Sequence, residues 1–199
     1  MPVGDTPTAK RSVTEGPSEA VKRLMREVEK ARLGADQTKG TVDEFVAEPD
    51  DESDLFTWTA EIRGFHLSSD AAVARFGNTL RELGFEGIKL GLSFPKDYPA
   101  SPAFVYVKKP RINAPYVFLN GGMCMQILSR EGWSPATTVQ SLLMAIRSMW
   151  MTPTGLHKKA GSQLSLRDSI TKAESQEENT EEEAKGDFNA VKMAHPDWF

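Results

Sequence analysis

Apolar residues recur with a helical period near the start of the chain and again near residue 140. The first apolar stripe has the spacing i, i+3, i+4 and i+7 and consists of Val21, Leu24, Met25 and Val28. It predicts an amphipathic helix over residues 18–33, with Ser18 as its N-cap. The second stripe consists of Val139, Leu142, Leu143, Ile146, Met149 and Trp150. It predicts a buried helix whose first turn is closed by a capping box of Thr137 and Gln140.

Between these two helices the pattern changes to the alternation that is typical of strands. The predicted strands cover residues 42–46, 56–62, 88–94 and 103–107. They are separated by an acidic loop (48–54), a short helix capped near Asp70, and a proline-rich segment (95–102). The order of helix, four strands, long loop and helix predicts an α+β fold with an antiparallel meander sheet, followed by C-terminal helical structure.

The two ends of the chain have a different composition. Residues 1–17 hold three prolines and no periodicity, which is typical of a flexible tail. Beyond Gly155 the sequence becomes polar, and a last amphipathic segment is indicated by Ala184, Phe188, Val191 and His195. The acids Glu181–Glu183 at its start suit the N-terminal end of a helix dipole. We therefore divide the chain into a tail (1–17), a core (18–158) and a polar linker with a helical extension (159–199).

Composition and charge exclude several classes of protein. The chain of 199 residues has a net charge of -4, whereas a general nucleic-acid binder shows a basic excess. The longest apolar stretch, 139–151, is too short and too polar to span a membrane, and the N-terminus has no signal-peptide pattern. We expect neither nucleic acid nor membrane as a partner, and a cytoplasmic or nuclear location.

The chain has a single cysteine, Cys124. An intrachain disulfide and a cysteine-rich metal site are therefore excluded, and His66, His157 and His195 lack the spacing of metal ligands. A lone cysteine is most often a small buried apolar residue. Here, however, it follows Gly121-Gly122-Met123 in an irregular stretch, where two glycines allow close approach of another backbone. An unrelated cysteine hydrolase stays open, although nothing positively supports one.

Three segments together resemble a known family. The first is Gly121-Gly122-Met123-Cys124-Met125-Gln126-Ile127-Leu128, followed by Trp133-Ser134-Pro135-Ala136 and an apolar helix. The second is the proline-rich segment 94–102, and the third is the basic helix at 18–33. In this order they are similar to the active-site block, the loop after the third strand and the first helix of ubiquitin-conjugating enzymes, from about residue 18 to residue 151. The resemblance implies the UBC fold.

One departure from the family pattern narrows the resemblance. Family members usually carry His-Pro-Asn ahead of the cysteine, and here Ala114-Pro115-Tyr116 stands at that place. The Q-type branch also lacks this tripeptide and has a Gly-Gly-x-Cys-Met block followed by Gly-Trp. The blocks 121–125 and Gly132-Trp133 resemble that branch most, and the ending 188–198 echoes its C-terminal helix.

The resemblance implies a two-step transfer reaction. Cys124 accepts ubiquitin, or a related modifier, as a thioester from an activating enzyme, and a lysine amine of a protein substrate then attacks that thioester, usually with a ligase. No cofactor is needed, because ATP is used by the activating enzyme upstream. The thiolate is the reactive form, and Lys108, Lys109 and Arg111 are candidates for lowering the pKa of the thiol. The alternative, that these three cations are solvated residues of a loop with no effect on the thiol, stays open.

Further site residues follow from the resemblance. Asn120 and Tyr116 are candidates to replace the family asparagine, as hydrogen-bond donors to the tetrahedral intermediate or by positioning the loop. Phe94, Pro135 and Ala136 match positions that contact ligases. Lys22, Arg23 and Arg26 match the helix face that meets the activating enzyme. Core packing for Phe94 and a solvated helix face for the cations are the alternatives.

Two other functions fit the same fold. One is a catalytically inactive ubiquitin-binding scaffold, which the missing asparagine favours and the retained cysteine disfavours. The other is a conjugating enzyme for a different ubiquitin-like modifier, which the sequence does not separate from the first interpretation.

Overall fold

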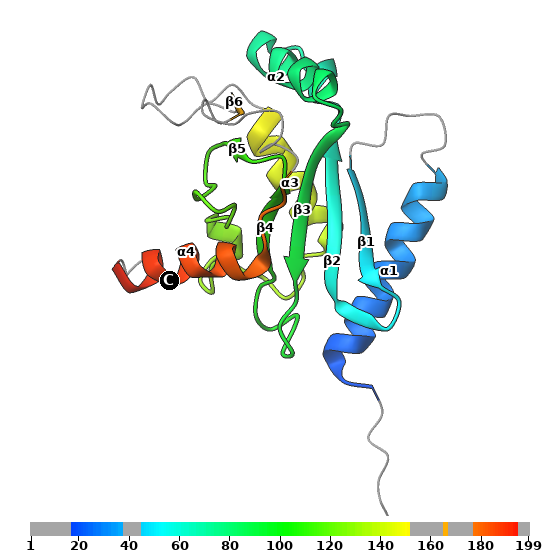
Figure 1. The fold of residues 1–199 in the computed structure, drawn as a ribbon. Coiled ribbons are helices and arrows are strands. Elements are labelled where there is room, and N and C mark those ends of the chain that lie inside the picture. Colours follow the sequence, from blue (N-terminus) through cyan, green and yellow to red (C-terminus); the bar gives the residue numbers. More distant parts are fainter. Residues whose placement is uncertain (1–16, 38–44, 152–164, 167–176, 195–199) are drawn as a thin grey trace, which may run out of the picture.

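The computed structural model describes residues 17–37, 45–151, 165–166 and 177–194. Its centre is a four-stranded antiparallel sheet in the order β1-β2-β3-β4 (Figure 1). The strands are β1 (Phe45–Asp51), β2 (Asp54–Arg63), β3 (Gly87–Ser93) and β4 (Phe104–Lys109). Each strand pairs with the next one along the chain, which confirms the predicted α+β fold with a meander sheet.

The helices lie around this sheet. They are α1 (Glu19–Gln37), α2 (Ala71–Glu82), α3 (Val139–Met151) and α4 (Glu181–Ala194), and short 3-10 turns are formed by Phe65–Leu67 and Gln126–Leu128. Figure 1 shows α1 on the β1 side of the sheet and α4 on the β4 side. A separate two-stranded pairing joins β5 (Ile112–Asn113) to β6 (Ser165–Leu166). Strand β4 and helix α4 are the elements that contact the segment just before Cys124.

Successive side chains of a strand point to opposite faces of the sheet, and the pairing register brings the apolar ones of neighbouring strands to the same face, where the core forms. Trp58 pairs with Leu92 and Leu92 with Val105, so that three apolar side chains stand in a row across the sheet. All three are buried, together with Leu143 and Ile146 of α3. The apolar stripe predicted for α3 is therefore confirmed as its core face.

The acidic segment 48–54 is not the loop that the sequence predicts. β1 continues to Asp51 and β2 begins at Asp54, so only Glu52 and Ser53 form the turn. Pro49 is accepted within β1 because this strand lies at the edge of the sheet, where one side needs no ladder hydrogen bonds. The turn is closed locally, since the Asp51 carboxylate accepts hydrogen bonds from the backbone N–H and hydroxyl of Ser53.

The buried face of α1 is rotated relative to the predicted stripe. Leu24 is fully buried as expected, but Met25 is 57% exposed and Glu27 is only 3% exposed. A charged side chain, Glu27, therefore lies on the buried face of this helix, although it is not part of the predicted apolar stripe. The reason is the ion pair of Glu27 with Arg23, at 2.7 Å, which allows the carboxylate to be buried.

The N-terminal cap of α3 is also displaced from its predicted position. Thr138 and Ser141, rather than Thr137 and Gln140, exchange reciprocal hydrogen bonds between side chain and backbone, at 2.9 and 3.0 Å. Helix α1, in contrast, begins as predicted, since the Ser18 hydroxyl accepts from the N–H of Val21 at 3.3 Å.

Several expectations fall on residues outside the described ranges. These are the tail up to residue 16, the strand positions 42–44, His157, the linker residues 159–164 and 167–176, His195 and the ending 195–199. The division of the chain at residues 17 and 158 stays a prediction. Among the described residues, no helix has the length and apolar character to cross a membrane, and no group of three His, Cys, Asp or Glu side chains could hold a metal ion.

Candidate functional site

Cys124 follows a short segment that runs along the outer edge of β4. The N–H of Val107 donates to Gly121 O at 2.8 Å, and the N–H of Met123 donates to Val105 O at 3.0 Å. These bonds attach the segment 121–123 to β4 as an additional, irregular edge strand. Cys124 leaves this edge as a free, half-buried thiol.

The turn before this segment holds Cys124 from its other side. The N–H of Cys124 donates to Tyr116 O at 2.9 Å, and the N–H of Phe118 donates to Gly122 O at 2.8 Å. Val117 and Met123 form a bridge between the same two stretches. The backbone of the cysteine is thus fixed between β4 and residues 116–118, although no regular element contains it.

Tyr116 has a backbone conformation that is unusual for its residue type. Its φ is 61°, in the left-handed region, where a Cβ crowds the neighbouring carbonyl. Its side chain is 61% exposed, so burial of the ring does not compensate for this cost. In this conformation the carbonyl oxygen of Tyr116 accepts the hydrogen bond from the N–H of Cys124. Tyr116 therefore positions the cysteine through its backbone.

The two glycines before the cysteine are required by what packs on them. Gly121 has a φ of 88°, and a Cβ there would lie 2.5 Å from Val107 O and 2.7 Å from Asn179 Nδ2. A Cβ on Gly122 would lie 2.9 Å from Ala184 O. The sequence predicts that another backbone approaches the glycine pair closely. In the structure, Asn179 and Ala184 from the C-terminal part of the same chain do so.

Asn120 is held at its backbone by a residue that the sequence did not reveal. Its N–H donates to Asp187 Oδ2 of α4 at 3.0 Å. Asn179, just before α4, is also missed by sequence reasoning, although it is buried and donates twice to β4. One signal could have located the start of α4, namely the spacing Thr180-x-x-Glu183, because these residues form its capping box.

Burial raises the pKa of the Cys124 thiol above its ordinary value. The sequence suggested instead that three nearby cations lower it. In the structure these cations face carboxylates: Lys108 faces Asp50 at 3.5 Å, Lys109 faces Glu178 at 3.4 Å, and Arg111 faces Glu177 at 3.9 Å. The thiol is consequently neutral over a wider pH range than an exposed cysteine.

Phe94 lies inside the chain. Its side chain is 5% exposed and packs edge-on against Trp58 and Tyr98, with ring centroids 5.6 and 4.9 Å apart. Pro135 and Ala136 are exposed. The contact of these three residues with a ligase stays a prediction. Of the three, Pro135 and Ala136 are accessible to a partner protein.

Arg23 joins the two predicted partner surfaces. Its guanidinium donates to Pro135 O at 2.9 Å and to Thr137 O at 2.8 Å, so α1 is fastened to the loop before α3. Lys22 and Arg26 are exposed on the same helix. The structure therefore brings Arg23 and Pro135 together, while the role of the three cations toward an activating enzyme stays a prediction.

Comparison with known proteins points to one family. A family profile described as "Ubiquitin-conjugating enzyme" matches residues 85–182, which include Cys124. The chain is 33% identical over 141 residues to a Drosophila melanogaster protein named as a Q-like ubiquitin-conjugating enzyme, covering 69% of this chain and 43% of that protein. It is 30% identical over 120 residues to a Homo sapiens protein that is also named as a Q-like ubiquitin-conjugating enzyme, covering 60% of this chain and 71% of that protein.

A solved structure of human ubiquitin-conjugating enzyme E2 G1 is 30% identical, with a TM-score of 0.48 over 67% of this chain and 95% of that one. The chain thus spans less than half of the Drosophila relative and about seven tenths of the human one. The similarity to the Q-like proteins agrees with the branch indicated by the block around Cys124.

Proposed function

The chain belongs to the ubiquitin-conjugating enzyme family, and from this premise we propose that it carries ubiquitin as a thioester on Cys124 and transfers it to lysine amines. The observation that carries the proposal is the placement of the only cysteine of the chain. Cys124 is free and half-buried, its N–H donates to Tyr116 O, and the preceding residue Met123 donates to Val105 O of β4. A nucleophile fixed in this way is positioned for attack without being enclosed.

The chemistry consists of two acyl transfers. In the first, the Cys124 thiolate attacks the thioester carbonyl that joins ubiquitin to the activating enzyme, a new carbon–sulfur bond forms, and the thiolate of the activating enzyme leaves. In the second, a lysine amine attacks the Cys124 thioester, the amide forms, and the Cys124 thiolate leaves. The exchange is nearly balanced in energy, so positioning contributes more than acid–base groups.

The raised pKa of Cys124 is compatible with this role. A smaller share of the thiol is ionised at neutral pH, but each thiolate is more nucleophilic, since nucleophilicity rises with the pKa of the thiol. The chemistry needs a reduced thiol, which favours a cytoplasmic or nuclear location.

Asn120 and Tyr116 have separate proposed roles. Tyr116 fixes the backbone of Cys124 through its carbonyl. Asn120 has its backbone anchored, so its side chain is the preferred donor to the oxyanion of the tetrahedral intermediate, in place of the family asparagine. Replacing Asn120 with Ala is expected to slow lysine discharge while thioester loading proceeds.

The partners follow from the pathway. We propose that Lys22, Arg23 and Arg26 of α1 meet the activating enzyme, and that the exposed loop of Pro135 and Ala136 meets a ligase with Phe94 supporting it from the core. Lys22→Glu and Arg26→Glu should slow loading, because like charges then oppose the acidic partner surface that a basic helix face fits. Arg81→Glu, which reverses an exposed cation on α2 and outside α1, is the matched control.

The decisive experiment is a loading assay. The protein is mixed with ubiquitin, its activating enzyme and ATP, and analysed on gels with and without reductant. An adduct that reductant removes, and that is absent in Cys124→Ala, is expected. Cys124→Ser should give an adduct that resists reductant, because an oxygen ester replaces the thioester. Absence of any adduct with ubiquitin contradicts the proposal. An adduct with another modifier alone would assign that modifier, and tight binding of ubiquitin without an adduct would assign a scaffold.

A further inference from the structure

The segment just before α4 is hydrogen-bonded to β4, at the position where β4 also pairs with the glycines before Cys124. The backbone N–H of Asn179 donates to Lys108 O at 2.8 Å, and its side-chain Nδ2 donates to Val107 O at 2.8 Å. Asn179 is 4% exposed. Val107 is also the residue whose N–H donates to Gly121 O. One strand position thus joins the C-terminal segment to the glycine pair before Cys124.

Helix α4 continues this contact over the loop itself. Ala184 is fully buried and its carbonyl closes over Gly122. Three residues later, the Asp187 carboxylate accepts from the N–H of Asn120 at 3.0 Å. The ring of Phe188 lies edge-on to Phe104 of β4, at 5.6 Å, and to Phe118 of the loop, at 6.4 Å. The positions i, i+3 and i+4 of α4 therefore form one face that covers the loop.

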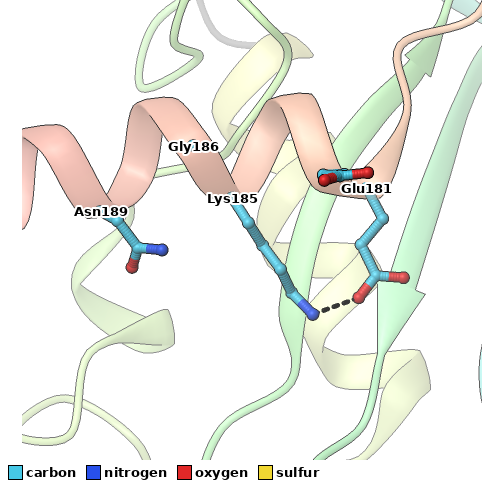
Figure 2. Close-up of a pocket in the computed structure, with 5 residues that line it drawn as sticks. Glu181, Lys185, Gly186 and Asn189 are labelled. Carbon is cyan, nitrogen blue, oxygen red and sulfur yellow. Dashed lines mark hydrogen bonds and ion pairs between the residues drawn. The ribbon is translucent and has the colours of Figure 1, made fainter.

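A second surface of α4 lies beside this contact. A shallow pocket there is lined by Glu181, Glu182, Lys185, Gly186 and Asn189, all from α4 itself. Figure 2 shows the side chains of Lys185 and Asn189 projecting from the same side of the helix. Asn189 is exposed, and Lys185 pairs with Glu181 along the helix. Because Lys185 also lies over the ring of Phe104, at 5.5 Å, the exposed Asn189 is the control position on this helix.

The ion pairs near Asn179 add little to the anchoring. Lys109 with Glu178 and Arg111 with Glu177 are partly exposed pairs at 3.4 and 3.9 Å. Such pairs contribute little to stability because solvent screens them and ordering the side chains costs entropy. The buried amide of Asn179 and the charged acceptor Asp187 are therefore the principal polar anchors.

We propose that Asp187 is a positioning residue for Cys124, and that α4 sets the reactivity of the cysteine by fixing the Asn120–Gly122 backbone. The inference rests on the proposed function only for its consequence in catalysis. The anchoring itself is independent of ubiquitin. The family profile ends at residue 182, so Asp187 lies beyond the part of the chain that the profile describes.

The mechanism follows from the chain of contacts. The backbone from residue 120 to residue 124 is continuous, and it is held at Asn120 by Asp187, at Gly121 by Val107 and at Cys124 by Tyr116. Loss of the first anchor frees the end of this stretch that carries the proposed oxyanion donor. The loosened loop exposes the thiol more, which removes part of the burial that raises its pKa. Alkylation should then become faster while productive transfer becomes slower.

The first test needs no ubiquitin. Two quantities are measured in the full chain: the hydrogen-exchange rate of the Asn120 amide, by NMR, and the rate at which iodoacetamide alkylates Cys124. Asp187→Ala should raise amide exchange about tenfold, as expected when a hydrogen bond to a charged acceptor is lost, and should raise the alkylation rate about threefold or more. Asp187→Asn keeps an acceptor oxygen and should restore most of both values. Asn189→Ala should leave both unchanged.

The amide of Leu90 in β3 reports global opening, and its exchange should be the same in all variants because it lies in the central sheet. If Asp187→Ala leaves the Asn120 amide and the alkylation rate at their original values, the inference is wrong. It is equally wrong if Asp187→Asn behaves like Asp187→Ala, since the acceptor oxygen would then not matter.

The second test follows discharge of the loaded thioester to free lysine. Asp187→Ala should lower the maximal discharge rate about tenfold, with little change in the lysine concentration at half-maximal rate, because the reacting groups are misplaced rather than the amine unbound. Unchanged discharge in a variant with raised amide exchange would overturn the catalytic part of the inference. Failure of the unaltered chain to load any modifier would instead contradict the proposed function, while the amide exchange would still decide the anchoring.

Discussion

The carboxylate of Glu27 in α1 accepts a hydrogen bond from the backbone N–H of Val139, the first residue of α3, at 3.2 Å. The other oxygen of the same carboxylate pairs with Arg23 at 2.7 Å. A helix begins with unpaired N–H groups and a positive dipole end, and a buried anion satisfies both. A residue of α1 thus caps the N-terminus of α3, the helix that follows the loop of Cys124.

Replacing Glu27 with Ala should lower the free energy of unfolding by about 3 kcal/mol, since it leaves Arg23 without its carboxylate and the N–H of Val139 without an acceptor. Glu27→Gln keeps one acceptor and should cost less. The measurement is urea unfolding followed by circular dichroism. Glu29→Ala on the exposed side of α1 is the control and should change the value by less than about 0.5 kcal/mol. Equal effects of Glu27→Ala and Glu29→Ala would contradict the capping role.

Substitutions at Gly121 and Gly84 distinguish the cost of backbone strain from the cost of steric crowding. Both have a φ of 88°, but a Cβ on Gly84 meets nothing within 4 Å, whereas on Gly121 it meets Val107 O at 2.5 Å. Gly84→Ala should therefore cost about 1 kcal/mol from strain alone. Gly121→Ala should cost about 2 kcal/mol more, because β4 or Asn179 must move. The difference is read from unfolding midpoints, and similar costs for the two variants would show that the close approach is unimportant.

Tyr116→Gly should be more stable than Tyr116→Ala by about 1 kcal/mol. Both variants lose the exposed ring, but only glycine adopts a φ of 61° without strain. The carbonyl that accepts from Cys124 is kept in both. Urea unfolding of the pair measures the difference. A less stable glycine variant would mean that the backbone of Tyr116 is not strained.

The alkylation rate of Cys124 should rise with pH to a midpoint above that of the same chain unfolded in urea. Burial disfavours the thiolate, so the pKa in the folded state is raised. The sign for stability follows from linkage: this contribution is fully present below the pKa of the unfolded thiol and is lost as the pH rises through the raised folded pKa. A native midpoint at or below that of the unfolded chain would contradict the effect of burial.

Local patterns predicted the elements that depend on neighbours in sequence. The cap at Asp70 is an example, since its carboxylate accepts from the N–H of Ala72 at 2.9 Å and of Val73 at 3.0 Å. The capping box of α3 lies one residue later than the pattern predicts, because Thr137 and Thr138 are equally suitable by type. Arg23 helps to decide between them by taking the carbonyl of Thr137.

The sequence by itself determined the meander of four strands, the core face of α3 and the cysteine that is proposed to react, because periodicity and a rare residue in a glycine-rich block are readable along the chain. Only the tertiary structure decided that Glu27 is buried, that Phe94 packs in the core and that Lys108, Lys109 and Arg111 face carboxylates. It also decided that Asp187, which lies far from Cys124 in the sequence, accepts a hydrogen bond from the backbone N–H of Asn120 in the loop before Cys124. These outcomes depend on contacts between distant segments, and side-chain chemistry alone does not select which of many possible partners comes within 3 Å.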